Sequence, residues 1–244
     1  MADFINTIDV LGDDAVIDGI LQRTIAEFKD NDLTKLFDSA FRGCTALVEV
    51  DLPNVTEVGA QTFASCSALE KVNLPEITDL RVTAQVGCFS GCKSLREINI
   101  PKVVTIGESN NNNWAGTFSG LPIERLILPN AKYIGRMAFG SCKQLVYADF
   151  GKYVYFWGAC FESCSALKTV VLRSESLCGM YNSGAFSGTP IASGNGYFYV
   201  PRALVDSYKA ATNWSVYGTM FRALEDYTVD GTITGELDEV KIAA

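Results

Sequence analysis

One phrase recurs along the chain and constrains its fold more than any other feature. Its clearest copies are Ala40–Pro53, Thr62–Pro75 and Cys88–Pro101, and the second of these reads TFASCSALEKVNLP. The copies share a phenylalanine, followed five or six positions later by a leucine or isoleucine. This repetition predicts a solenoid, because no single coil can bury its apolar residues and neighbouring coils must stack into one core. The aligned phenylalanines are Phe41, Phe63, Phe89, Phe118, Phe139, Phe161 and Phe186.

Each repeat unit contains two apolar runs that predict short parallel strands. The first, such as Leu47–Leu52, alternates as a strand with one buried face does, and Pro53 ends it. The second, such as Val55–Val58, ends at Gly59, where glycine permits a turn. The sequence therefore predicts an α/β-type repeat solenoid of about seven coils over residues 39–202.

The N-terminal segment, residues 1–38, lacks the repeated phrase. Asp13 and Asp14 are suited to start a helix whose apolar face runs from Val16 to Phe28. We expect this segment to be a helical cap that covers the first coil. The alternative is a docking element that attaches the solenoid to a larger assembly.

The C-terminal segment, residues 203–244, predicts a second cap and a loosely held tail. A short helix is expected near Leu204–Tyr208, and a hairpin is expected around Asp230–Gly231. Apolar residues between them would cover the last coil: Trp214, Tyr217, Met220, Phe221 and Leu224.

The repeat resembles a known family. The segments Ala40–Cys44, Leu47–Pro53 and Val55–Gly59, with their later copies, resemble the leucine-rich repeats of BspA-like bacterial surface proteins, which also occur in treponemal proteins. The resemblance covers roughly Phe37–Arg202. It implies a right-handed solenoid used for recognition or adhesion, with no catalytic residues. The acidic opening of the chain is similar to that of repeat proteins encoded by phages and prophages of gut Firmicutes.

Composition excludes several classes of function. The formal net charge is −8 and no block of basic residues occurs, so we expect no nucleic-acid binding. The chain has no histidine, which excludes Ser-His-Asp catalysis and histidine-containing metal sites. No stretch is apolar enough for membrane insertion, and the first 20 residues lack the basic start of a secretory signal. We expect no cofactor.

The eight cysteines fall in columns of the repeat. Residues three positions after the phenylalanine, such as Cys66, would stack on their counterparts in the next coil. The pair Cys88 and Cys92 has a spacing seen in metal sites, but two columns of one repeat produce it automatically. We therefore predict buried free thiols that pack as small apolar side chains.

Three insertions supply the first candidate binding surface. They lie around Arg81–Gly87, Glu108–Gly116 and Met180–Gly184, all between the second apolar run and the next phenylalanine. Insertions at one point of a repeat emerge on one side of a solenoid, which is often the binding side. Aromatic rings beside amides suit sugars or peptides, whereas ordinary variable loops are the alternative. The candidates are Arg81, Asn110, Asn111, Asn112, Asn113, Trp114, Tyr181 and Asn182.

The outward positions of the first strands form a second candidate surface. They are charged near the N-terminus, as at Glu49 and Asp51, and aromatic or apolar near the C-terminus. This gradient predicts a contact patch, or else a transition into the C-terminal cap. The aromatic members are Tyr147, Tyr197 and Tyr199, and Tyr153, Tyr155 and Trp157 are expected to extend the patch.

These features predict a non-enzymatic recognition or structural protein. Our first hypothesis is a phage or prophage protein of the virion or of host attachment, which stays in the cytoplasm before assembly. The alternative is a BspA-like adhesin at the bacterial cell surface. An enzyme built on carboxylate pairs such as Glu49 and Asp51 is the third class, disfavoured because an open strand face excludes little water. The expected partner is a protein or a cell-surface glycan, and homo-oligomer or virion assembly is left open.

Overall fold

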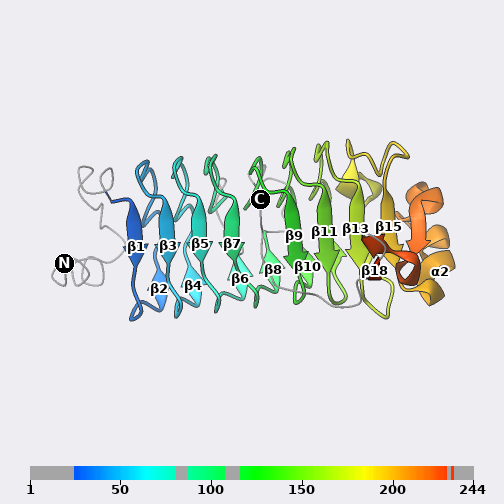
Figure 1. Cartoon of the computed structure of the whole chain (residues 1–244), viewed down its shortest axis with the longest axis horizontal. Coiled ribbons are helices and arrows are strands. Elements are labelled where there is room, and N and C mark those ends of the chain that lie inside the picture. Colours follow the sequence, from blue (N-terminus) through cyan, green and yellow to red (C-terminus); the bar gives the residue numbers. More distant parts are fainter. Residues whose placement is uncertain (1–24, 81–86, 108–115, 230–231, 234–244) are drawn as a thin grey trace.

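The computed structural model describes residues 25–80, 87–107, 116–229 and 232–233 of the 244-residue chain. It is an elongated solenoid in which short strands lie side by side along the long axis (Figure 1). All strand pairs within the coils are parallel, as in the pairing of Val50 with Val72. The predicted solenoid of short parallel strands is therefore confirmed, with about eight turns among the described residues.

The first strand of each coil belongs to one of two sheets. The N-terminal sheet contains β1 (Glu27–Lys29), β3 (Glu49–Asp51), β5 (Lys71–Asn73) and β7 (Glu97–Asn99). The C-terminal sheet contains β9 (Arg125–Leu128), β11 (Tyr147–Phe150), β13 (Thr169–Leu172), β15 (Tyr197–Val200) and β16 (Phe221–Ala223).

The second strand of each coil has two residues and pairs with its counterparts in neighbouring coils. Two of these strands pair with each other, β2 (Lys35–Leu36) and β4 (Glu57–Val58). The others form a five-stranded sheet, here called the second-strand sheet: β6 (Asp79–Leu80), β8 (Thr105–Ile106), β10 (Tyr133–Ile134), β12 (Tyr155–Phe156) and β14 (Gly179–Met180).

The aligned phenylalanines form one continuous column in the core. From Phe41 to Phe186, the ring centroids of successive members lie 5.2–5.4 Å apart and their planes agree within 14°. Every ring from Phe63 onward is fully buried. Such aromatic pairs contribute roughly 0.5–1.5 kcal/mol each beyond their buried area. The column therefore ties each coil to its two neighbours.

All eight cysteines are free and buried, as predicted. Cys66 shows why the column favours this residue: its thiol donates to the carbonyl oxygen of Phe41 in the preceding coil, at 2.9 Å. The side chain thus fills a small apolar space and gives the Phe41 carbonyl oxygen a second donor, beside the Cys44 N–H at 3.1 Å.

The N-terminal helix was predicted to extend through Phe28, and this part of the prediction is wrong. Residues Glu27–Lys29 form strand β1, which pairs with β3 in the register of the repeat. Phe28 packs on Phe41, with ring centroids 4.8 Å apart. The repeat therefore begins one coil earlier than expected. The rest of the predicted helix, before residue 25, lies outside the described residues.

Short helices lie within and after the last coils, and a hairpin follows them. The predicted helix near Val205 and the predicted hairpin are present, although the hairpin turn itself, residues 230–231, is outside the described part. The elements are η2 (Ser183–Phe186), η3 (Arg202–Leu204), α2 (Val205–Ala210), η4 (Ser215–Met220), η5 (Leu224–Asp226), β17 (Thr228–Val229) and β18 (Thr232–Ile233).

Two buried side chains attach these helices to the last coil. The indole N–H of Trp214 donates to the carbonyl oxygen of Cys178 at 2.8 Å. The main-chain N–H of Cys178 donates to the Tyr208 hydroxyl oxygen at 2.9 Å. Both aromatic rings pack on Phe221 of β16, so the end of the solenoid is covered by apolar side chains. Figure 1 shows α2 at this end of the molecule.

Candidate binding surfaces

Two of the three insertions lie mostly outside the described residues. Arg81 and the residues from Asn110 to Trp114 belong to these parts, so their assignment stays a prediction. The end of the longer insertion is described: a Cβ added at Gly116 would lie 1.6 Å from the Met137 carbonyl oxygen. The insertion therefore rejoins the solenoid where two coils touch, and only glycine fits there.

The third insertion contains the candidates Tyr181 and Asn182, which differ in their surroundings. The side-chain oxygen of Asn182 accepts a hydrogen bond from the Gly184 N–H at 3.0 Å and caps η2. This contact gives Asn182 a local structural role. Tyr181 is 44% exposed, and its ring stacks on Trp157 with a centroid distance of 4.0 Å.

Tyr181 is part of a larger group of rings that we call the aromatic patch. The rings of Tyr133 and Tyr155, on neighbouring coils, lie 6.2 Å apart and are parallel within 5°. Trp157 contacts both of them, at 6.5 and 6.2 Å. The patch comprises Tyr133, Tyr153, Tyr155, Trp157 and Tyr181, which lie on or beside β10, β12 and β14.

The repeat itself explains how the patch arises. Four main-chain N–H groups each donate to the carbonyl oxygen of the residue that ends the second strand of the preceding coil. These N–H groups belong to Gly107, Gly135, Trp157 and Tyr181. The two C-terminal coils therefore carry large aromatic residues at the position that glycine occupies in earlier coils. Sequence alignment of this column could have revealed the patch.

A missing side chain makes room for one ring of the patch. A Cβ added at Gly179 would lie 2.3 Å from Cδ2 of Tyr155, so the Tyr155 ring lies over this glycine. Burial by its neighbours, together with nearby Tyr153 and Tyr181, raises the pKa of Tyr155. Its hydroxyl therefore stays protonated at neutral pH and can donate a hydrogen bond.

The N-terminal strand face is polar and open. Asn73 donates to the Asp51 carboxylate, and Asn99 donates to the Asn73 side-chain oxygen, each at 2.7 Å. Lys29 and Glu49 form an exposed ion pair at 2.8 Å. Exposed pairs of this kind contribute little to stability, so this face presents a regular but weakly held set of polar groups.

Part of the C-terminal strand face is covered, which corrects the prediction for Tyr147. This residue is only 7% exposed, because the Tyr227 ring packs against it and the Arg125 guanidinium lies 4.2 Å from its ring centroid. Tyr227 also contacts Tyr199, with ring centroids 4.4 Å apart. The chain after β16 thus folds back over strands that were expected to be free, and burial raises the pKa of Tyr147.

A buried polar network lies beside Tyr147. Its hydroxyl donates to the Asp149 carboxylate at 2.7 Å, and Arg173 donates two N–H groups to the same carboxylate at 2.8 and 2.9 Å. The Asp149 side chain is 2% exposed and that of Arg173 12%. The paired charges and the hydroxyl satisfy one another, so this network stabilises the covered face rather than offering a site.

Tyr197 remains exposed on the C-terminal sheet, with the Arg222 guanidinium over its ring at 4.3 Å. The expected extension of this surface by Tyr153, Tyr155 and Trp157 is wrong, because those residues belong to the second-strand sheet. Tyr197 and Tyr199 pair with β13 and β16 instead. The sequence candidates therefore divide between two separate surfaces.

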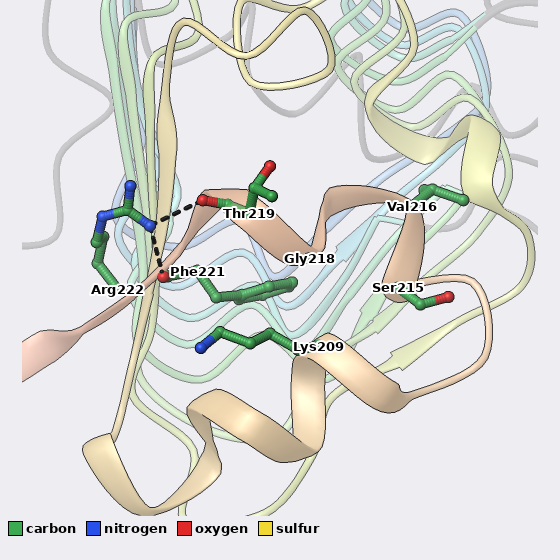
Figure 2. Close-up of a pocket in the computed structure, with 7 residues that line it drawn as sticks. All are labelled: Lys209, Ser215, Val216, Gly218, Thr219, Phe221 and Arg222. Carbon is green, nitrogen blue, oxygen red and sulfur yellow. Dashed lines mark hydrogen bonds between the residues drawn. The ribbon is translucent and has the colours of Figure 1, made fainter.

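A pocket of about 500 Å³ opens at the C-terminal end of the solenoid (Figure 2). Both cationic side chains that line the pocket already have partners within the protein. Arg222 donates to the carbonyl oxygens of Thr219 and Phe221, and Lys209 pairs with Asp206 at 3.1 Å. The lining residues are Lys209, Ser215, Val216, Gly218, Thr219, Phe221 and Arg222.

A smaller pocket, of about 380 Å³, lies at the other end of the chain between β2 and β4. Lys35 at its edge pairs with Glu57 at 2.9 Å. Within the described ranges, no cluster of three or more potential metal ligands occurs. None of the described helices combines the length and the apolar character that crossing a bilayer requires.

Comparison with known families agrees with the architecture. The model of the BspA type leucine-rich repeat region matches residues 23–114 and 114–197, in six copies. A leucine-rich repeat protein from Bacteroides ovatus is similar at 25% identity, over 71% of this chain and 45% of that chain, with a TM-score of 0.47. A leucine rich cell surface protein from Faecalibacterium prausnitzii is similar at 18% identity, over 72% and 60%, with a TM-score of 0.38.

This chain therefore spans less than two thirds of the length of either solved structure. A search of curated proteins gave no match. The family model, in contrast, covers well over half of the sequence. The chain belongs to the BspA type leucine-rich repeat family.

Proposed function

We propose that this protein is a non-enzymatic recognition module of the bacterial cell surface that binds a protein or a glycan. The observation that carries the proposal is the aromatic patch, which places five large rings on the outside of a solenoid whose interior is already filled. Aromatic residues are enriched at binding surfaces because they bury much area at little entropic cost. Repeats of the BspA type are usually surface-associated, which supports this location.

The carboxylates on the open faces support a binding role over a catalytic one. Glu49 and Asp51, the pair considered as a catalytic centre, lie on a flat strand face, where Glu49 pairs with Lys29 and Asp51 with Asn73. Catalytic carboxylates need a site that excludes water and shifts their pKa. A flat, hydrated face suits recognition of an extended partner instead.

Binding can be tested with the fluorescently labelled protein on an immobilised panel of extracellular matrix proteins, mucins and bacterial polysaccharides. We expect at least one selective ligand, lost in Tyr181→Ala and retained in Tyr197→Ala. The second variant is a matched control, because Tyr197 has a similar exposure of 38% but lies on the other sheet. Failure of every ligand class to bind would refute a recognition role.

The cellular location needs a separate experiment. Brief protease treatment of intact cells that produce the protein should release its peptides, whereas a cytoplasmic control protein should survive until lysis. The virion placement remains a prediction from the sequence, because the family match does not address it. Detection of the chain in purified phage particles by mass spectrometry would favour that placement over the cell surface.

A further inference from the structure

We propose that the aromatic patch, together with Lys132 and Lys152, binds a carboxylated polysaccharide. This inference rests on the proposed recognition function and names the class of ligand. Two observations carry it, the geometry of the rings and the charge beside them.

The rings form a platform and not a groove. Tyr133 and Tyr155 are nearly parallel, and Tyr181 continues the aromatic surface through its stack on Trp157. Tyr153 and Tyr181, each 44% exposed, offer hydroxyls at its border. Sugar rings have apolar C–H faces and polar rims, so flat aromatic faces bordered by hydroxyls match both.

The topology disfavours a peptide as the occupant. An extended peptide would bind by adding a strand to a free sheet edge or by entering a groove. The strands beneath the platform, β10 and β12, are each paired on both sides, so neither has a free edge. The two pockets described above lie at the ends of the solenoid, away from these strands.

Two exposed lysines next to platform tyrosines in the chain point to an acidic ligand. Lys132 directly precedes Tyr133, and Lys152 directly precedes Tyr153. Lys152 donates to the side-chain oxygen of Asn130 at 3.0 Å. Both lysines are exposed, and no carboxylate of the described residues lies within ion-pair distance of either.

Four lysines of the N-terminal coils behave differently. Each of them pairs with a glutamate, usually on a neighbouring coil, and the pairs are Lys29–Glu49, Lys35–Glu57, Lys71–Glu97 and Lys102–Glu76. In a chain with a net charge of −8, two uncompensated cations beside a platform are available for the carboxylates of a ligand.

The test uses the full chain and soluble polygalacturonic acid, with its carboxyl-reduced derivative as the neutral counterpart. Affinity is measured by isothermal titration at low and at raised NaCl. We expect binding of the acidic polymer only, weakened by salt because the lysine contacts are exposed. Lys132→Gln with Lys152→Gln, and separately Tyr181→Ala, should each weaken binding about tenfold. Tyr181→Phe keeps the stacked ring and loses one border hydroxyl, so it should recover most of the affinity.

Matched controls separate the site from general effects. Lys143→Gln with Lys168→Gln removes two exposed lysines outside the patch, and Tyr197→Ala removes a ring from the other sheet; both should bind within about twofold of the wild type. Equal affinity for the carboxyl-reduced polymer, or for polyglutamate, would overturn the inference. Binding to an immobilised protein but to no polysaccharide would overturn it while the recognition function stands.

Discussion

The thiol of Cys66 donates a hydrogen bond to the main-chain carbonyl oxygen of Phe41, one coil earlier, at 2.9 Å. The same contact recurs along the solenoid, so one column of side chains hydrogen-bonds to the backbone of another. Both groups are buried, and the thiol is a second donor to a carbonyl oxygen that also accepts a main-chain N–H, that of Cys44 in the case of Phe41. The other pairs are Cys92 with Phe63, Cys142 with Phe118, and Cys164 with Phe139, at 3.0–3.1 Å.

Replacing Cys66 by alanine should lower the free energy of unfolding by about 2 kcal/mol. The change removes a buried sulfur atom and one of the two hydrogen bonds to the Phe41 carbonyl oxygen, which still accepts from the Cys44 N–H. Urea denaturation followed by circular dichroism measures the effect, with the exposed Ser67→Ala as the control. Equal stability of the two variants would show that the thiol contact contributes nothing.

The protein should lose stability in alkaline solution because of its buried thiols. Desolvation by burial raises the pKa of both Cys88 and Cys92 to about 12, from about 8.5 in an unfolded chain. The folded state therefore holds these protons more tightly. The stabilisation is complete below pH about 8.5 and is lost as the pH rises towards about 12. The melting temperature should fall as the pH rises across this range. The fall should be less steep in the double variant Cys88→Ala with Cys92→Ala.

The central phenylalanine Phe89 should be among the most sensitive core positions. Its ring stacks on Phe63 and on Phe118, each at 5.2 Å, so Phe89→Ala breaks two inter-coil contacts. We expect a loss of about 3–5 kcal/mol. Stability in a solenoid depends on neighbouring coils, so the variant should also unfold less cooperatively. Calorimetry can show this as a broadened or divided unfolding transition. The control variant Leu177→Ala, at a partly exposed position, should keep a single transition.

The Asp149–Arg173 pair should show non-additive mutational effects. Arg173→Met leaves a buried carboxylate without its cation and should cost about 3 kcal/mol. Adding Asp149→Asn removes the unpaired charge and should recover part of that loss. Urea denaturation of Arg173→Met, Asp149→Asn and the double variant measures the difference. Lys102→Gln, which breaks the exposed pair with Glu76, should cost under about 1 kcal/mol. Additive losses at Asp149 and Arg173 would contradict the coupling.

The repeat was predictable because its columns report core packing directly. Phenylalanine and cysteine occupy positions where they pack on their counterparts or on the backbone of neighbouring coils, so their spacing follows the length of the coil. The first coil was missed because Asp30 stands where Leu52 stands in the next one. Asp30 is buried yet satisfied, since it accepts hydrogen bonds from the N–H groups of Asp32 and Leu33 at 2.7 and 2.9 Å.

The surfaces were harder to predict, for two physical reasons. Exposure of Tyr147 depends on Tyr227, which is distant in sequence and belongs to no repeat. The aromatic patch depends on which sheet each ring joins, and the proximity of Tyr155 and Trp157 to the first-strand residues in sequence suggested the wrong one. The substitution of aromatic residues for glycine in one column was the available signal.

The stacked phenylalanine column also bears on how such a gene can change. Phe41 and Phe63 are 22 residues apart, as are Phe139 and Phe161, and each ring stacks on its neighbours in the column. Duplication or excision of one such segment would place equivalent rings and strands against each other at the junction. Recombination can therefore change the length of the solenoid by whole coils. The segments at its two ends stay the same.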